Sequence, residues 1–165
     1  MTQIEIEQKL LNRIFKPWGK YISCDDGWYK ILEDLDNKLS YLDPEYKINQ
    51  IKEKFGTLRF YFESQSSDLI KDIMDDCVSA AAYASSYTCE YCGSRLGKLQ
   101  DSGWVKTACD ECWTKKQEER KNRESALDEL VKFNQENGLY YLPLEDVLAR
   151  QYTTAIAKEE EDKLK

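Results

Sequence analysis

Hydrophobic residues recur at helical spacing in two long stretches of the chain. The first stretch consists of Trp28, Ile31, Leu32, Leu35, Leu39 and Leu42. The second repeats the same spacing with Ile70, Ile73, Met74, Cys77, Ala81 and Ala84. Spacing of three and four residues places such side chains on one side of a helix, so both stretches predict helices with one buried face.

The segments around these helices carry start and stop signals. Ser23 or Asp25 is available to cap the first helix, and Ser66 or Ser67 the second, because these short polar side chains accept hydrogen bonds from exposed backbone N–H groups. A further helix is predicted before Pro17. Its expected apolar face consists of Ile4, Leu11, Ile14 and Phe15.

The spacing of apolar residues changes between the two long helical stretches. Apolar Leu58, Phe60 and Phe62 alternate with more polar neighbours, which predicts a strand with one buried face. The preceding segment, 46–51, predicts a weaker strand whose alternation slips once, as at a β-bulge. Phe55-Gly56-Thr57 supplies the turn between them. We therefore expect an α+β fold in which helices pack on a small antiparallel hairpin.

The last third of the chain predicts a helical extension. The ten residues after Trp113 are all polar, and Pro143 opens a second amphipathic stretch that contains Leu144, Val147 and Leu148. With the cysteine-rich segment between them, the patterns divide the chain into three parts. These are an α+β core at 1–87, a zinc ribbon at 88–113 and the helical extension at 114–165.

Four of the six cysteines form two matched pairs. Cys89 and Cys92 make one C-x-x-C pair, and Cys109 and Cys112 make the other after sixteen intervening residues. This spacing is typical of a closed, tetrahedral zinc site with a structural role, and it predicts one Zn²⁺ per chain. Two disulfides or a redox-active pair are the alternatives. A cytosolic setting disfavours disulfides, and a redox motif needs only a single pair.

The composition narrows the function classes. The chain of 165 residues has a net charge of −7, which argues against a general nucleic-acid coat. It has no histidine, so neither an imidazole base nor an imidazole metal ligand is available. The sequence also has no apolar run long enough to cross a bilayer and no secretory signal pattern, so we expect a cytoplasmic protein without a membrane partner.

Two further groups of residues give weaker indications of alternative functions. Asp25, Asp26, Lys52, Glu53 and Arg59 could meet beside the hairpin and bind a magnesium ion and a phosphate, as in a metal-dependent nuclease or phosphoesterase. The structural alternative is that the aspartates cap a helix while the hairpin charges face water. Lys54 belongs to the same group of charges.

The second cluster lies around the second cysteine pair. Trp104 and the basic residues Lys116, Arg120 and Arg123 could contact nucleic acid. The alternative is an ordinary solvated helix, since Glu118, Glu119 and Glu124 lie among the basic residues and can pair with them.

The two remaining cysteines are expected to have structural roles. Cys77 lies on the apolar face of a predicted helix and is interpreted as a core residue. Cys24 either packs beneath Trp28 or forms a partly exposed thiol near a helix start, where a thiolate would be favoured.

Three motifs occur in a characteristic order. They are Asp26-Gly27-Trp28, the hairpin string from Gln50 to Tyr61, and Cys89-Glu90-Tyr91-Cys92-Gly93 followed by Gly103-Trp104. In this order the chain resembles the small zinc-ribbon proteins encoded by bacteriophages and prophages, over roughly 20–113. In those proteins the last ligand pair is often C-x-x-H, whereas here it is Cys109 and Cys112. The resemblance implies a viral protein in the host cytoplasm and implies no activity.

The leading hypothesis is a phage accessory protein that acts by binding. Its zinc ribbon and helical extension would engage and modulate a host or anti-phage defence protein, without catalysis. The nuclease or phosphoesterase and the nucleic-acid binder remain the alternatives. A homodimer also stays open, because the helical extension has apolar faces that a second copy could cover.

Overall fold

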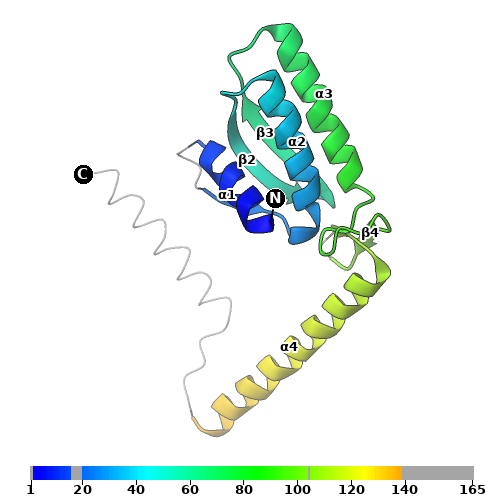
Figure 1. Ribbon diagram of the computed structural model, residues 1–165. Coiled ribbons are helices and arrows are strands. Elements are labelled where there is room, and N and C mark those ends of the chain that lie inside the picture. The colour runs from blue at the N-terminus through cyan, green and yellow to red at the C-terminus, as the bar shows by residue number, and fades with distance from the viewer. Residues whose placement is uncertain (1, 16–19, 104, 139–165) are drawn as a thin grey trace, which may run out of the picture. The chain divides into compact units, whose positions relative to one another are not determined.

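The computed structural model describes residues 2–15, 20–103 and 105–138 (Figure 1). The chain divides into two compact units, Met1–Lys116 and Gln117–Lys165. The described residues form four α-helices, a short 3₁₀ helix and two small sheets, which confirms the α+β class. The second amphipathic stretch predicted after Pro143 lies outside the described residues.

Helix α2 (Tyr29–Leu42) follows the predicted apolar pattern closely. Trp28 in the preceding 3₁₀ helix η1 (Asp26–Trp28) is fully buried, and so are Leu32 and Leu39. The expected cap is absent, however. The Asp25 side chain makes no capping hydrogen bond, and its backbone N–H instead donates to the Glu90 carboxylate at 3.2 Å.

The face predicted for the first helix was only partly right, since Ile14 is buried and Leu11 packs against the core while Ile4 and Phe15 are exposed. Helix α1 (Gln3–Arg13) starts at a capping box formed by Thr2 and Glu5. It buries Ile6 and Leu10, followed by Ile14 just past its end, whereas Ile4 is 77% exposed and Phe15 is 51% exposed. The observed spacing of four residues is an equally regular helical stripe, and the expected one relied on residues at the two ends of the segment.

The main sheet has three strands in the order β1-β2-β3. Strand β2 (Lys47–Lys54) pairs antiparallel with β3 (Thr57–Glu63), with a register shift between Ile48 and Gln50. Strand β1 (Ile22–Ser23) pairs in parallel with β2 and was not predicted, because two residues show no alternation.

Helix α3 (Asp68–Ser85) completes the main core. Met74 and Ala81 are buried, Cys77 is partly buried against the same cluster, and Ile73 is 40% exposed. Figure 1 shows α1, α2 and α3 together on one side of the sheet. The buried side of the sheet carries Ile51 and Phe60, which are directly paired. In the described part of the first unit, Figure 1 shows no helix on the opposite side of the sheet.

The cysteine-rich segment follows α3. Strands β4 (Lys98–Asp101) and β5 (Val105–Ala108) pair antiparallel, and helix α4 (Asp110–Glu136) begins directly after β5. Cys89 and Ala108 are fully buried in a second, smaller core. Helix α4 is 27 residues long and has no buried residue in the part of the chain that the structure describes.

One buried carboxylate ties α1 to α2. Asp36 is 1% exposed and lies 3.0 Å from Nε of Arg13 and 2.6 Å from Nζ of Lys9. It also accepts a hydrogen bond from the hydroxyl of Tyr46. A buried charge is stable only when it is fully partnered, so these contacts hold the two helices in one register.

Replacing Asp36 should therefore destabilise the core strongly. We expect Asp36→Asn to lower the free energy of unfolding by about 3 kcal/mol, because Arg13 loses its ionised partner in a buried setting. Asp34→Asn on the same helix is the matched control. Asp34 is exposed, and among the described residues it pairs with Lys30 alone, so its loss should cost less than about 1 kcal/mol. Urea unfolding of both variants measures the difference, and equal losses would contradict the role assigned to Asp36.

Candidate metal centre

Four cysteine side chains converge at the junction of two elements. Cys89 and Cys92 follow α3, while Cys109 and Cys112 lie at the start of α4. Their four sulfur atoms all lie within 4.8 Å of one another, and the Sγ atoms of Cys92 and Cys109 are 3.8 Å apart. A disulfide bond needs about 2.05 Å, so the four are free thiols. Such a group can hold one metal ion.

Local backbone turns direct the side chains of each cysteine pair toward the shared site. After the first pair, Gly93 has a φ of +75° and donates its N–H to the carbonyl of Cys89 at 2.9 Å. This left-handed position favours glycine, which explains why Gly93 follows Cys92. In the second pair, the N–H of Trp113 donates to the carbonyl of Cys109 at 2.9 Å, so both cysteines face one side of the first helical turn.

The backbone around the site favours a thiolate at Cys89. Burial by itself opposes ionisation of this thiol, but hydrogen bonds from the backbone of Cys109, Cys92 and Tyr91 outweigh it and the pKa is lowered. At Cys112 the result is the opposite. Burial first, and the neighbouring thiols second, raise the pKa of that group. Crowded thiols of this kind do not all lose their protons without a bound cation.

The first cysteine pair docks onto the start of η1. The indole Nε1 of Trp28 donates to the carbonyl of Thr88 at 2.8 Å, and the N–H of Gly27 donates to the carbonyl of Glu90 at 2.7 Å. A Cβ atom on Gly27 would lie 2.3 Å from the Cys89 oxygen and 2.4 Å from the Gly93 nitrogen. Only glycine therefore allows this approach.

The tip of the main hairpin makes a second contact with the same segment. The hydroxyl of Thr107 donates to the carbonyl of Gly56 at 2.6 Å, and Thr107 is fully buried. A Cβ atom on Gly56 would lie 2.5 Å from Leu99. The cysteine-rich segment is thus attached to the core at the η1 start and at the hairpin tip.

A buried charge cluster lies between these two contacts. Nζ of Lys106 is 2.8 Å from Glu90 and 3.3 Å from Glu53, with Asp25 at 3.8 Å. Burial alone would lower the pKa of Lys106, but the three carboxylates outweigh it and raise the pKa. Burial raises the pKa of Glu90, against the opposing effect of Lys106. The lysine therefore stays charged and is the shared partner of the three carboxylates.

The predicted polar site is only partly assembled. Asp25 and Glu53 meet at Lys106, but Lys52 pairs across the strands with Arg59 on the other side of the sheet. Asp26 lies in η1. Among the described residues, the four cysteines are the sole group of three or more metal-ligating side chains close enough to share an ion. The carboxylates expected to bind magnesium do not form such a group among the described residues.

The structure adds Glu90 and Lys106, which the sequence reasoning missed. In the sequence, Glu90 is a residue between the two cysteines of the first pair. In the structure its carboxylate is 0% exposed and therefore needs a cation. Its partner Lys106 lies 16 residues further along. The four residues of β5 show no alternation of buried and exposed positions, so the sequence offered no signal for Lys106.

The proposed basic contact surface is mostly an ordinary helix surface. Nε of Arg120 lies 2.9 Å from the carboxylate of Glu124 one turn later, so this charge is neutralised. Lys116 places its Nζ 5.5 Å from the ring centre of Tyr91, and Arg123 is exposed. Trp104 lies outside the described residues.

The other cysteines behave as core residues. Cys24 and Cys77 are partly buried and pack against the main core cluster. Burial first, then the charges of Glu90 and Asp25, raise the pKa of Cys24 to about 12. Cys24 is partly exposed, but its raised pKa favours the thiol over the thiolate, and its packing against the main core supports a structural role.

Comparison with protein-family models, curated proteins and solved structures finds no match for this chain. Within the described residues, no helix is both long enough and apolar enough to cross a membrane. The site must therefore be interpreted from its own geometry.

The close approach of the first cysteine pair to Gly27 can be tested by substitution. We expect Gly27→Ala to lower the free energy of unfolding by about 3 kcal/mol, because the methyl group would overlap the backbone of the first cysteine pair. Gly103→Ala is the control, since its Cβ would meet nothing within 4 Å and only its φ of +91° is strained. Urea unfolding compares the two. A larger loss at Gly103 would contradict the docking role of Gly27.

Proposed function

We propose that the cysteine-rich segment is a zinc ribbon with one structural Zn²⁺ and that the chain acts by binding a partner. The four-thiol cluster carries the proposal. Thiolates at the corners of a tetrahedron, each ~2.3 Å from zinc, lie about 3.8 Å apart. The Sγ atoms of Cys92 and Cys109 lie 3.8 Å apart, and all four sulfurs fall within 4.8 Å.

The donor set supports a structural rather than a catalytic metal. Four thiolates complete the zinc shell, so no position remains for the water or substrate that a catalytic zinc must bind. Soft thiolate ligands also favour zinc over magnesium or calcium. The metal would then join the turn after α3 to the first turn of α4.

Zinc content tests this part of the proposal. We expect the purified protein to hold one zinc per chain, and the Cys89→Ser and Cys112→Ser variants to lose it to a chelator far faster, because each loses one thiolate ligand. Cys77→Ser is the matched control and should keep the full zinc content, since Cys77 lies in the main core. Elemental analysis with a colorimetric chelator gives both quantities. Unchanged zinc retention in the ligand variants would rule out this site.

Helix α4 supports the binding part of the proposal. Ala126, Leu130 and Phe133 follow one another at helical spacing, and Leu130 and Phe133 are 51% and 54% exposed. A solvent-facing apolar stripe between charged residues is typical of a helix that docks onto another protein. Together with the resemblance to phage zinc-ribbon proteins, it favours an accessory protein that engages a host or anti-phage defence protein in the host cytoplasm.

The stripe can be tested with matched double variants. A partner is first captured from infected cells and then purified, so that affinity is measured with two defined components. We expect Leu130→Ser with Phe133→Ser to weaken the complex at least tenfold, because two apolar side chains worth about 1.5 kcal/mol or more each are removed. Asp128→Ser with Lys132→Ser is the control on the same helix and should leave affinity within about threefold.

The outcomes separate this proposal from its alternatives. Equal affinity of both double variants would exclude the stripe as the contact. If the wild-type chain self-associates in sedimentation experiments and only the Leu130/Phe133 variant is monomeric, the stripe is a homodimer contact instead. Phosphodiester cleavage that is lost on replacing Asp25 or Glu53 would favour the nuclease or phosphoesterase.

A further inference from the structure

The side of the main sheet opposite the helices is strongly basic. Pairing of Lys52 with Arg59 and of Lys54 with Thr57 places these residues opposite to the buried pair Ile51 and Phe60. Lys47 and Glu63 form the last pair on the same side. This side of β2 and β3 thus carries four cations and one carboxylate, in a chain whose net charge is −7.

The basic side chains in the middle of this surface have no acidic partner. In the part of the chain that the structure describes, no carboxylate forms an ion pair with Lys52, Lys54 or Arg59. Two carboxylates on the same strands have other contacts. Glu63 accepts a hydrogen bond from Asn49 at 3.0 Å, and Glu53 contacts Lys106 and the N–H of Gly56. The positive charge is therefore available to an anionic ligand.

Two exposed aromatic rings accompany these cations. Tyr61 is 46% exposed, and Nζ of Lys52 lies 5.6 Å from its ring centre. Phe55 at the hairpin tip is 69% exposed, and Nζ of Lys54 lies 5.2 Å from its ring centre. The surface thus alternates cations with accessible ring faces.

The backbone at the hairpin tip does not suit phenylalanine. Phe55 and Gly56 both have positive φ, 55° and 75°, which is the pattern of a type I′ turn. Asparagine or glycine is favoured at the first of these positions, because a bulky side chain is strained in the left-handed region. Exposure of the ring means that burial does not compensate for the strain. A strained, exposed aromatic residue indicates a role in contacting a ligand.

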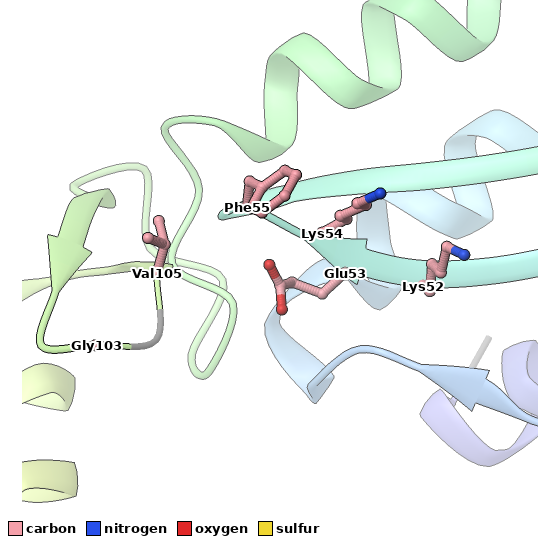
Figure 2. A pocket seen from close by; sticks show the side chains of 6 residues that line it. All are labelled: Lys52, Glu53, Lys54, Phe55, Gly103 and Val105. Carbon is pink, nitrogen blue, oxygen red and sulfur yellow. The ribbon is translucent and has the colours of Figure 1, made fainter.

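The same residues border a cleft. A cavity of about 490 Å³ is lined by Lys52, Glu53, Lys54 and Phe55 on the main hairpin and by Gly103 and Val105 on the cysteine-rich segment. Figure 2 shows Phe55 at the tip of the hairpin, with Gly103 and Val105 across the cavity from it. At the hairpin tip, the basic surface therefore continues into this cleft.

We propose that this basic aromatic surface binds single-stranded nucleic acid. Phosphates contact Lys52, Lys54 and Arg59, while unpaired bases stack on Tyr61 and Phe55. An open sheet with aromatic rings and flanking cations is the arrangement by which proteins hold single strands, since every base has a face for stacking. A duplex hides these faces. The interface uses neither the metal site nor the apolar stripe of α4, so it stands independently of the proposed partner protein.

Fluorescence anisotropy with the full-length, zinc-loaded protein tests the proposal. The probes are a labelled 12-nucleotide oligo-dT, its RNA counterpart oligo-U, and a duplex of the same length. We expect both single strands to bind at least tenfold more tightly than the duplex. The logarithm of affinity should fall against the logarithm of salt with a slope of about −2, because three phosphate contacts each contribute about 0.7.

Variants on the sheet locate the interface. Replacing Lys52, Lys54 and Arg59 with glutamine should abolish most binding and flatten the salt dependence, whereas Tyr61→Ala should weaken it about tenfold at an unchanged salt slope. Phe55→Asn is the sharpest test. It should raise the urea midpoint, since asparagine suits the turn, and still weaken binding. Lys38→Gln, an exposed lysine on α2, is the charge control and should change neither quantity.

A second set of variants separates this surface from the basic part of α4. The proposal expects binding to survive replacement of Lys116, Arg120 and Arg123 with glutamine. Binding that is lost in that variant and kept in the sheet variants would overturn it. So would tighter binding of the duplex, or an absence of binding to any of the three probes at low salt.

Discussion

The rest of the structure depends on the contact between Gly27-Trp28 and the first cysteine pair. Trp28 is fully buried in the main core, yet its only polar atom reaches out to the carbonyl of Thr88 at 2.8 Å. Gly27, one residue earlier, bonds to the carbonyl of Glu90 at 2.7 Å. These two residues thus connect the main core to the cysteine-rich segment, and any shift of the cysteine pair must displace Trp28, the largest fully buried side chain of the main core.

The docking of the cysteine pair also explains the pairing of buried Glu90 with Lys106. Bringing η1, the hairpin tip and β5 together removes Glu90 from water, and an isolated buried carboxylate is unstable. Lys106 supplies the compensating charge and also contacts Glu53 and Asp25, one from each neighbouring element. The cluster therefore makes the junction specific, because a different docking angle would leave at least one of these groups without its partner.

The sequence predicted the features that depend on local spacing. The apolar faces of α2 and most of α3, the class of the fold and the convergence of the four cysteines all follow from residues close together in the chain. The sequence did not predict the features that depend on contacts between residues far apart in the chain. Glu90 meets the backbone of Asp25 across 65 positions, and β1 is too short to show a period. In α1, two stripes were equally regular, and only the packing against α2 selects Ile6 and Leu10.

Helix α4 poses the converse problem, because none of its residues is buried within the part of the chain that the structure describes. A helix gains most of its stability from packing, and starting its first turn is the costly step. Here that turn contains Cys109 and Cys112, so a metal held by these thiols would fix it in place before the helix extends. Ion pairs one turn apart, such as Arg120 with Glu124, then add a few tenths of a kcal/mol each. The helix can thus keep Leu130 and Phe133 at its surface, because its stability begins at the cysteine cluster rather than at an apolar face.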